Sequence, residues 1–76
     1  MNKTADYYMS LPYTLEIIPD NEEGGWFVRV KELRGCMTQA DTWEDVLPMI
    51  REAMQLWLEV SLEHGHPIPE PERVVN

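Results

Sequence analysis

The pattern of apolar and polar residues along the chain shows two short stretches with a period of two and one long stretch with the period of a helix. The long stretch covers residues 42–64, where apolar side chains recur every three or four positions and charged ones fill the opposite side. It therefore predicts a long amphipathic helix. Its apolar side consists of Trp43, Val46, Leu47, Ile50, Ala53, Met54, Trp57, Leu58 and Val60.

Both ends of this helix carry termination signals. Thr42 is a suitable N-cap, and Asp45 three residues later forms a pair that resembles a capping box. Gly65 is placed to end the helix in the left-handed conformation. Pro48 lies beyond the first turn, where proline removes a backbone donor and crowds the preceding turn. We expect a kink or a separate first turn near Leu47, with the main helix starting at Pro48.

Two further apolar residues, Met49 and Leu56, widen the apolar side to about 200° of arc, where a surface helix usually shows about 100° or more. Such width is consistent with two buried contacts, one with the domain's own sheet and one with a second surface. The alternative is that these two side chains are simply exposed, which is common for single apolar residues. On the first interpretation, the residues expected to mediate self-association are Met49, Leu56, Trp57 and Val60.

Residues 13–19 and 26–33 alternate in the manner of a β-strand, and residues 36–40 are expected to form a short third strand. A polar loop with paired glycines, residues 20–25, separates the first two and suits a hairpin. The order strand, strand, strand, helix predicts an α+β fold, in which one long helix packs on one face of a three-stranded antiparallel sheet.

The expected domain spans residues 13–71. Residues 1–12 show no clear period and are expected to form a loosely ordered N-terminal arm. After the helix, the segment PIPEP (residues 67–71) must be extended, because alternating prolines exclude a helix. Residues 72–76 form a short C-terminal tail, in which we expect no DNA-binding domain.

Composition narrows the classes of function. The formal net charge of −8 repels phosphate backbones, so no direct nucleic-acid binding is expected, and it favours a basic partner. Charge alone is better explained by solubility. Cys36 is the single cysteine of the 76 residues, which excludes an intrachain disulfide and fits a reducing, cytoplasmic location. No apolar run approaches the length of about 20 residues that spans a membrane. A core this small favours homo-oligomerisation.

Four segments in order resemble the HicB-type antitoxin family: GGWFV (24–28), LRGCMTQADTWED (33–45), IREA (50–53) and PIPEP (67–71). Together the segments span most of residues 13–71, and their order and spacing are more specific than any one of them. The chain departs from the family pattern at Ala40, where glycine is commoner, at Glu32, where proline is frequent, and at Pro48 in the helix.

The resemblance implies a partial ribonuclease-H-like fold that associates into dimers or tetramers. It also implies an antitoxin of a type II toxin–antitoxin system, which binds and occludes a small, basic HicA-like toxin, an mRNA endonuclease that uses a histidine. Acidic side chains of the hairpin loop and of the helix's outer face would suit that toxin. The residues expected to contact it are Glu22, Glu23, Glu52 and Glu59.

Two alternatives to the antitoxin function are considered. The chain could be a stand-alone oligomeric domain of this type without a toxin. It could also be a degenerate ribonuclease-H-like nuclease, which requires carboxylates converging on two metal ions. The candidate carboxylates are Glu16, Asp20, Glu22, Glu23 and Asp41. They do not occupy matched points of neighbouring strands, so we expect no enzyme, metal or cofactor.

Two other candidate chemistries are weaker. His64 and His66, with Glu63 nearby, fall short of the ligand set of a structural metal site, and His64 is better placed to interact with the carbonyls at the helix end. Cys36 has no identifiable basic partner that would activate its thiol. We expect Cys36 to be a buried strand residue.

Overall fold

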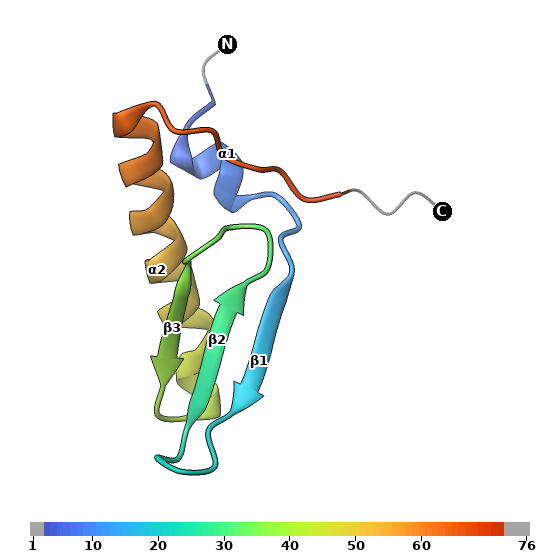
Figure 1. Cartoon of the computed structure of the whole chain (residues 1–76), viewed down its shortest axis with the longest axis vertical. Coiled ribbons are helices and arrows are strands. Elements are labelled where there is room, and N and C mark those ends of the chain that lie inside the picture. Colours follow the sequence, from blue (N-terminus) through green and yellow to red (C-terminus); the bar gives the residue numbers. More distant parts are fainter. Residues whose placement is uncertain (1–2, 73–76) are drawn as a thin grey trace.

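The computed structural model describes residues 3–72 and consists of a three-stranded antiparallel sheet with one long helix across one face (Figure 1). This is the α+β arrangement that the hydrophobic pattern predicts. The elements in chain order are α1 (Ala5–Met9), β1 (Leu15–Pro19), β2 (Trp26–Val30), β3 (Met37–Ala40) and α2 (Trp43–His64).

The sheet has the order β1-β2-β3, so both outer strands are edges. Leu15 pairs with Val30 in one ladder, and Trp26 pairs with Ala40 in the other. Each strand is shorter than predicted. β2 ends at Val30 because residues 31–36 form a tight turn, closed by the Cys36 N–H donating to the Leu33 carbonyl at 3.0 Å. The predicted continuation of β2 as far as Leu33 is therefore wrong.

The core lies between the inner face of the sheet and the inner side of α2. Val28 and Val30 on β2 are buried while Arg29 between them is exposed, as expected for a strand with one face on the core. The largest fully buried side chains are Leu33, Ile50, Leu58 and Val28. The apolar residues of the helix and those of the strands thus form one core cluster.

The ends of α2 lie where the sequence signals predict. The Thr42 side chain accepts a hydrogen bond from the Asp45 N–H at 3.3 Å. Gly65 ends the helix with φ +69°, and the His66 N–H donates to the Ser61 carbonyl at 2.9 Å.

The predicted separate first turn near Leu47 is wrong, because α2 is one helix from Trp43 to His64 with Pro48 inside it. Proline at this position removes one backbone donor, the partner of the Glu44 carbonyl. Glu44 is exposed, so water can satisfy that carbonyl. One lost bond near a capped and packed end does not divide the helix.

The short helix α1 is not predicted by the sequence pattern. Thr4 caps it by accepting from the Tyr7 N–H at 3.3 Å, and Tyr8 is buried against the core. The Tyr7 hydroxyl donates to Glu70 at 3.0 Å, and the Tyr13 hydroxyl donates to the Pro69 carbonyl at 2.6 Å. The first and last described segments therefore lie side by side (Figure 1), unlike the loosely ordered arm expected over residues 1–12; residues 1, 2 and 73–76 lie outside the described part.

Candidate protein-interaction surfaces

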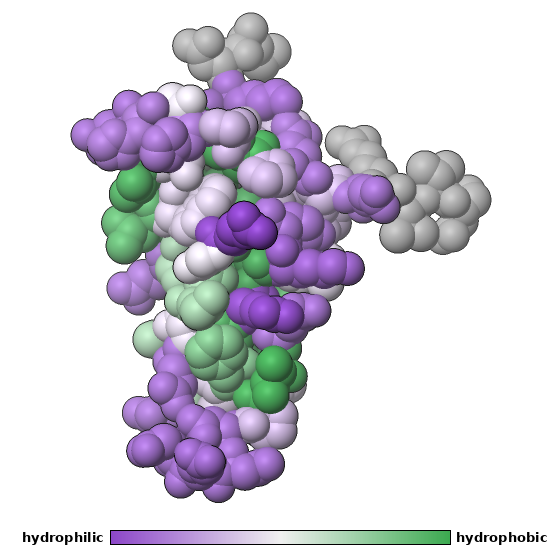
Figure 2. Space-filling model, viewed as in Figure 1, coloured by the Kyte–Doolittle hydropathy of each residue, from purple (hydrophilic) through white to green (hydrophobic). Residues whose placement is uncertain are grey.

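One end of the molecule collects acidic side chains from two parts of the chain. The hairpin loop between β1 and β2 and the turn between β3 and α2 lie at the same end, where Figure 2 shows hydrophilic side chains gathered. Gln39 joins the two parts by donating to Asp20 at 2.9 Å. We call this surface the acidic end. Its members are Asp20, Glu22, Glu23, Asp41, Glu44 and Asp45.

The hairpin loop is held by hydrogen bonds from its own backbone. An Asp20 carboxylate oxygen accepts from the N–H groups of Glu22 and Glu23, each at 3.1 Å. Gly25, with φ +82°, follows so close to β3 that a Cβ there would stand 2.5 Å from the Ala40 carbonyl oxygen. The loop is thus fixed against β3, with Glu22 and Glu23 exposed.

Exposed apolar side chains adjoin the acidic end. Trp43 is 57% exposed and rests edge-on against Trp26, with ring centroids 5.0 Å apart. Leu47, one turn further along α2, is 54% exposed. No Lys, Arg or His occurs in residues 4–28 or 35–50, which contain the whole acidic end. This surface therefore combines an uncompensated negative charge with an exposed aromatic ring.

A groove of about 550 Å³ lies between the start of β3 and the C-terminal half of α2. The Trp57 indole N–H donates to the Arg34 carbonyl at 3.0 Å and so ties the groove's floor to the β2–β3 turn. Leu56 and Met37, at its sides, are exposed, and Figure 2 shows apolar side chains along this half of α2. We call it the β3–α2 groove. It is lined by Arg34, Gly35, Cys36, Met37, Ala53, Leu56, Trp57, Val60, Ser61 and His66.

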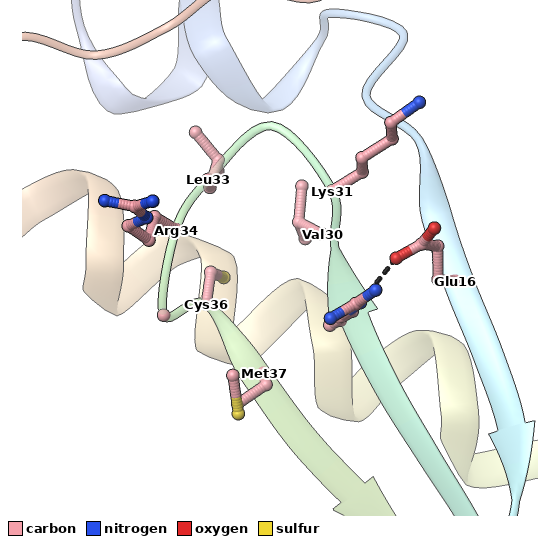
Figure 3. Close-up of a pocket in the computed structure, with 9 residues that line it drawn as sticks. Glu16, Val30, Lys31, Leu33, Arg34, Cys36 and Met37 are labelled. Carbon is pink, nitrogen blue, oxygen red and sulfur yellow. Dashed lines mark hydrogen bonds and ion pairs between the residues drawn. The ribbon is translucent and has the colours of Figure 1, made fainter.

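Positive charge concentrates around the β2–β3 turn. A shallow cavity of about 360 Å³ on the outer face of the sheet is lined by Arg29, Lys31 and Arg34, half of the six Lys and Arg residues of the chain. Arg29 forms an ion pair with Glu16, drawn as a dashed line in Figure 3. Lys31 and Arg34 point away from each other in the same view. The three cations do not converge on one point, so they do not form a pocket for a single anion.

The residues considered for chemistry are held by structural interactions. Cys36 is buried, and that burial raises the pKa of its thiol to about 11, which keeps it protonated and unreactive at neutral pH. The rings of His64 and His66 stack, with centroids 5.6 Å apart. Glu16 forms an ion pair with Arg29, and Asp20 accepts hydrogen bonds from the backbone of its own loop. Within residues 3–72, no three His, Cys, Asp or Glu side chains lie close enough to hold a metal ion.

The residues expected to contact a toxin are not brought together. Glu22 and Glu23 lie at the acidic end, whereas Glu52 and Glu59 lie further along α2, on its exposed side. Three members of the acidic end, Asp41, Glu44 and Asp45, were not among the expected contacts. They lie between β3 and α2 and at the start of α2. The long runs of sequence without Lys, Arg or His are the signal that could have identified them.

The residues expected to mediate self-association are brought together in part. Leu56, Trp57 and Val60 all line the β3–α2 groove, while Met49, 37% exposed, lies nearer the start of the helix and does not line it. Trp43 and Leu47 were expected on the packed side of the helix but are exposed, because it is Val46 and Ile50 that face the core at this end of α2. None of the helices within residues 3–72 has the length and hydrophobicity of a membrane span.

Comparisons with known proteins connect this fold to a family. Residues 13–76 match the family described as HicB-like antitoxin of bacterial toxin-antitoxin system. A UPF0150 protein of Synechocystis is 30% identical over 83% of this chain and 81% of its own length, and one of Thermoplasma acidophilum is 37% identical over 78% and 84%. A protein named Antitoxin HicB 1, of Photorhabdus laumondii, is 38% identical over 83% of this chain.

The match to that named antitoxin covers only 39% of its length, so the chain corresponds to one part of it. No solved structure matches the chain significantly. The family match includes the whole sheet, the β2–β3 turn, α2 and the segment after it, which are the elements that build both surfaces. The sheet-and-helix fold and the order of the motifs agree with these matches, and the chain belongs to the HicB-like antitoxin family.

Proposed function

We propose that this chain is an antitoxin of a type II toxin–antitoxin system and that its acidic end binds and covers a small, basic, HicA-like toxin. Membership of the HicB-like antitoxin family supports a toxin partner in general. The observation that carries the choice of surface is the acidic end itself, six carboxylates without a neighbouring cation in the sequence runs that form it. A basic RNA-cleaving protein is the complementary partner.

Charge alone would steer such a partner more than hold it. Affinity requires a desolvated anchor, and aromatic residues are the commonest anchors of protein interfaces. Trp43 fits that role because it is 57% exposed and already fixed in orientation by Trp26. Leu47 extends the apolar area along the helix. The acidic end therefore has the two components of a tight interface, an anchor and a charged rim.

This proposal retains two of the four expected toxin contacts. Glu22 and Glu23 project from the fixed hairpin loop into the acidic end. Glu52 and Glu59 lie elsewhere on α2 and are not part of the proposed toxin surface. The mechanism is occlusion: the bound antitoxin covers the toxin's basic RNA-binding surface. The chain itself catalyses nothing in this scheme.

The test uses the full chain and the small basic protein encoded beside its gene. The two are co-expressed, co-purification is measured, and growth is scored with and without the chain. We expect the double variant Glu22→Lys/Glu44→Lys to weaken binding by about 10- to 100-fold, because two favourable charge contacts become repulsive. Trp43→Ala is expected to weaken it by a similar factor through loss of the anchor.

The matched control is Asp6→Lys/Glu72→Lys. Both of its positions are exposed and outside the acidic end. Each substitution of an acidic residue by Lys raises the net charge by two, so both double variants have a net charge of −4. Equal loss of binding in the two double variants would mean that net charge, and not this surface, matters. No co-purification and no growth rescue by the unmodified chain would favour a stand-alone domain without a toxin.

A further inference from the structure

We propose that the β3–α2 groove is the contact between two copies of this chain, related by a two-fold axis that passes close to Leu56. The proposal concerns self-association and does not depend on the existence of a toxin. The groove and the acidic end lie on different parts of the molecule. A dimer formed through the groove therefore leaves the acidic end of each copy accessible.

The groove is apolar and partly preformed. Leu56 is 65% exposed, the highest fraction among the exposed large apolar residues, with Met37 at 48% and Val60 at 43% beside it. Trp57 is fixed by its hydrogen bond to the Arg34 carbonyl. A projecting leucine next to a groove is a self-complementary shape, because each copy can insert its Leu56 into the groove of the other.

The charges on either side of Leu56 are also self-complementary. On the β3 side, Arg34 lines the groove and its side chain points toward α2 (Figure 3). On the other side, helical geometry places Glu52 and Glu59 next to Leu56, one turn before it and one turn after it. A two-fold rotation about Leu56 exchanges the two sides. Arg34 of each copy then faces Glu52 or Glu59 of the other.

This charge pattern selects a second copy over a basic toxin. Among the residues that the structure describes, no Asp or Glu lines the groove. A basic protein would meet Arg34 there without a carboxylate in the groove to compensate. A copy of this acidic chain, in contrast, supplies carboxylates at the required position on its own α2. Arg34 also offsets part of the repulsion between two chains of net charge −8.

The first experiment measures the mass of the full chain in solution by sedimentation equilibrium from about 1 to 100 µM. We expect a dimer of the 8.9 kDa chain. Leu56→Glu places a charge in the centre of the contact and is expected to raise the dimer dissociation constant by at least about 100-fold. The matched control is Leu47→Glu, the same substitution in the same helix at a similarly exposed position outside the groove. It is expected to leave the constant within about threefold.

The second experiment tests the orientation of the two copies. Arg34→Glu and Glu59→Arg are each expected to raise the dissociation constant by about tenfold, because each places like charges in contact. The combined variant restores opposite charges, so its dissociation constant should return to within about threefold of the unmodified chain. Circular dichroism of every variant confirms that the helix and sheet are kept.

Several results would overturn the proposal. An unmodified chain that is monomeric at 100 µM contradicts it directly. A dimer that resists Leu56→Glu, or that responds equally to Leu47→Glu, forms through another surface. Failure of recovery both in this combined variant and in the matching combination of Arg34→Glu with Glu52→Arg rejects the two-fold arrangement. None of these results involves the toxin, and loss of toxin binding without loss of the dimer would count against the proposed function alone.

Discussion

Gly24 and Gly25 are neighbours with almost the same backbone conformation but different surroundings. Their φ angles are +81° and +82°, a region that L side chains rarely adopt. A Cβ on Gly24 would meet nothing within 4 Å, whereas one on Gly25 would stand 2.5 Å from the Ala40 carbonyl oxygen. The first position is constrained by conformation alone, and the second also by close packing of the hairpin loop on β3.

These two glycines allow the effects of conformation and contact to be separated. We expect Gly24→Ala to lower the free energy of unfolding by about 1 to 2 kcal/mol, the cost of a left-handed alanine. Gly25→Ala should lower it by at least about 3 kcal/mol, because the β3 backbone must also move. Urea denaturation of both variants at one protein concentration measures the difference. Equal losses would show that the contact with Ala40 is unimportant.

Glu32 anchors the start of the sheet. Its carboxylate accepts hydrogen bonds from both the N–H and the hydroxyl of Thr14, each at 2.9 Å. Desolvation by itself would raise the pKa of Glu32, but the hydrogen bonds from Thr14, together with the backbone N–H of Glu32 and the charge of Lys31, outweigh it and lower the pKa from its usual value of 4.5. The sequence showed Glu32 only as a departure from the family pattern, because its partner lies 18 residues earlier.

This lowered pKa predicts a dependence of stability on pH. A carboxyl group with a lower pKa in the folded state stabilises the fold above its unfolded pKa, and the contribution is lost as the pH falls through the folded value. We therefore expect Glu32→Gln to be less stable than the unmodified chain at pH 7, with the difference shrinking as the pH is lowered below about 4.5. Thermal unfolding from pH 3 to 7 tests this. A difference that does not change with pH would assign the loss to packing.

The two ends of α2 could be predicted from the sequence, since capping depends on residues a few positions apart, as with Thr42 and Asp45 or Gly65 and His66. The effect of Pro48 could not, because local rules assign proline a fixed cost while the remaining helix decides whether it is tolerated. α1 was also missed: five residues are too few for a period to be visible, and so short a helix depends on tertiary contacts such as that of Tyr8.

Pro48 therefore weakens α2 without dividing it. Pro48→Ala supplies the missing donor to the Glu44 carbonyl and is expected to raise the free energy of unfolding by about 1 to 3 kcal/mol. Arg51→Ala, at an exposed position in the next turn, is the control and should change it by less than about 0.5 kcal/mol. Chemical denaturation monitored by circular dichroism measures both. A destabilised Pro48→Ala variant would mean that the proline is adapted to this helix start.

At the scale of the whole molecule, the fold could be predicted and the surfaces only in part. Patterning identified the three strands, the long helix and the core between them, because burial imposes its period on the sequence. Which exposed residues meet is decided by topology instead. The hairpin loop and the start of α2 form one acidic end only because β2 returns the chain antiparallel to β1 and β3 then runs back to the same end.

The β3–α2 groove could also be predicted only in part. The width of the apolar side of α2 indicated a second contact, and Leu56, Trp57 and Val60 do lie together there. Met37 and Arg34 could not be assigned to that contact, because they belong to the β2–β3 turn and the start of β3, about 20 residues earlier. A helical wheel describes one element and omits what its neighbours contribute.

The contact between α1 and the segment that follows α2 joins the beginning and the end of the described chain. Tyr7 and Tyr13 each donate a hydrogen bond to that segment, and Tyr8 and Pro71 are both buried. Neither segment is covered unless the other is in place, so the two are expected to open as one cooperative unit. During synthesis on the ribosome, α1 emerges before the segment that follows α2, so it can complete its docking only after residues 69–71 have been made.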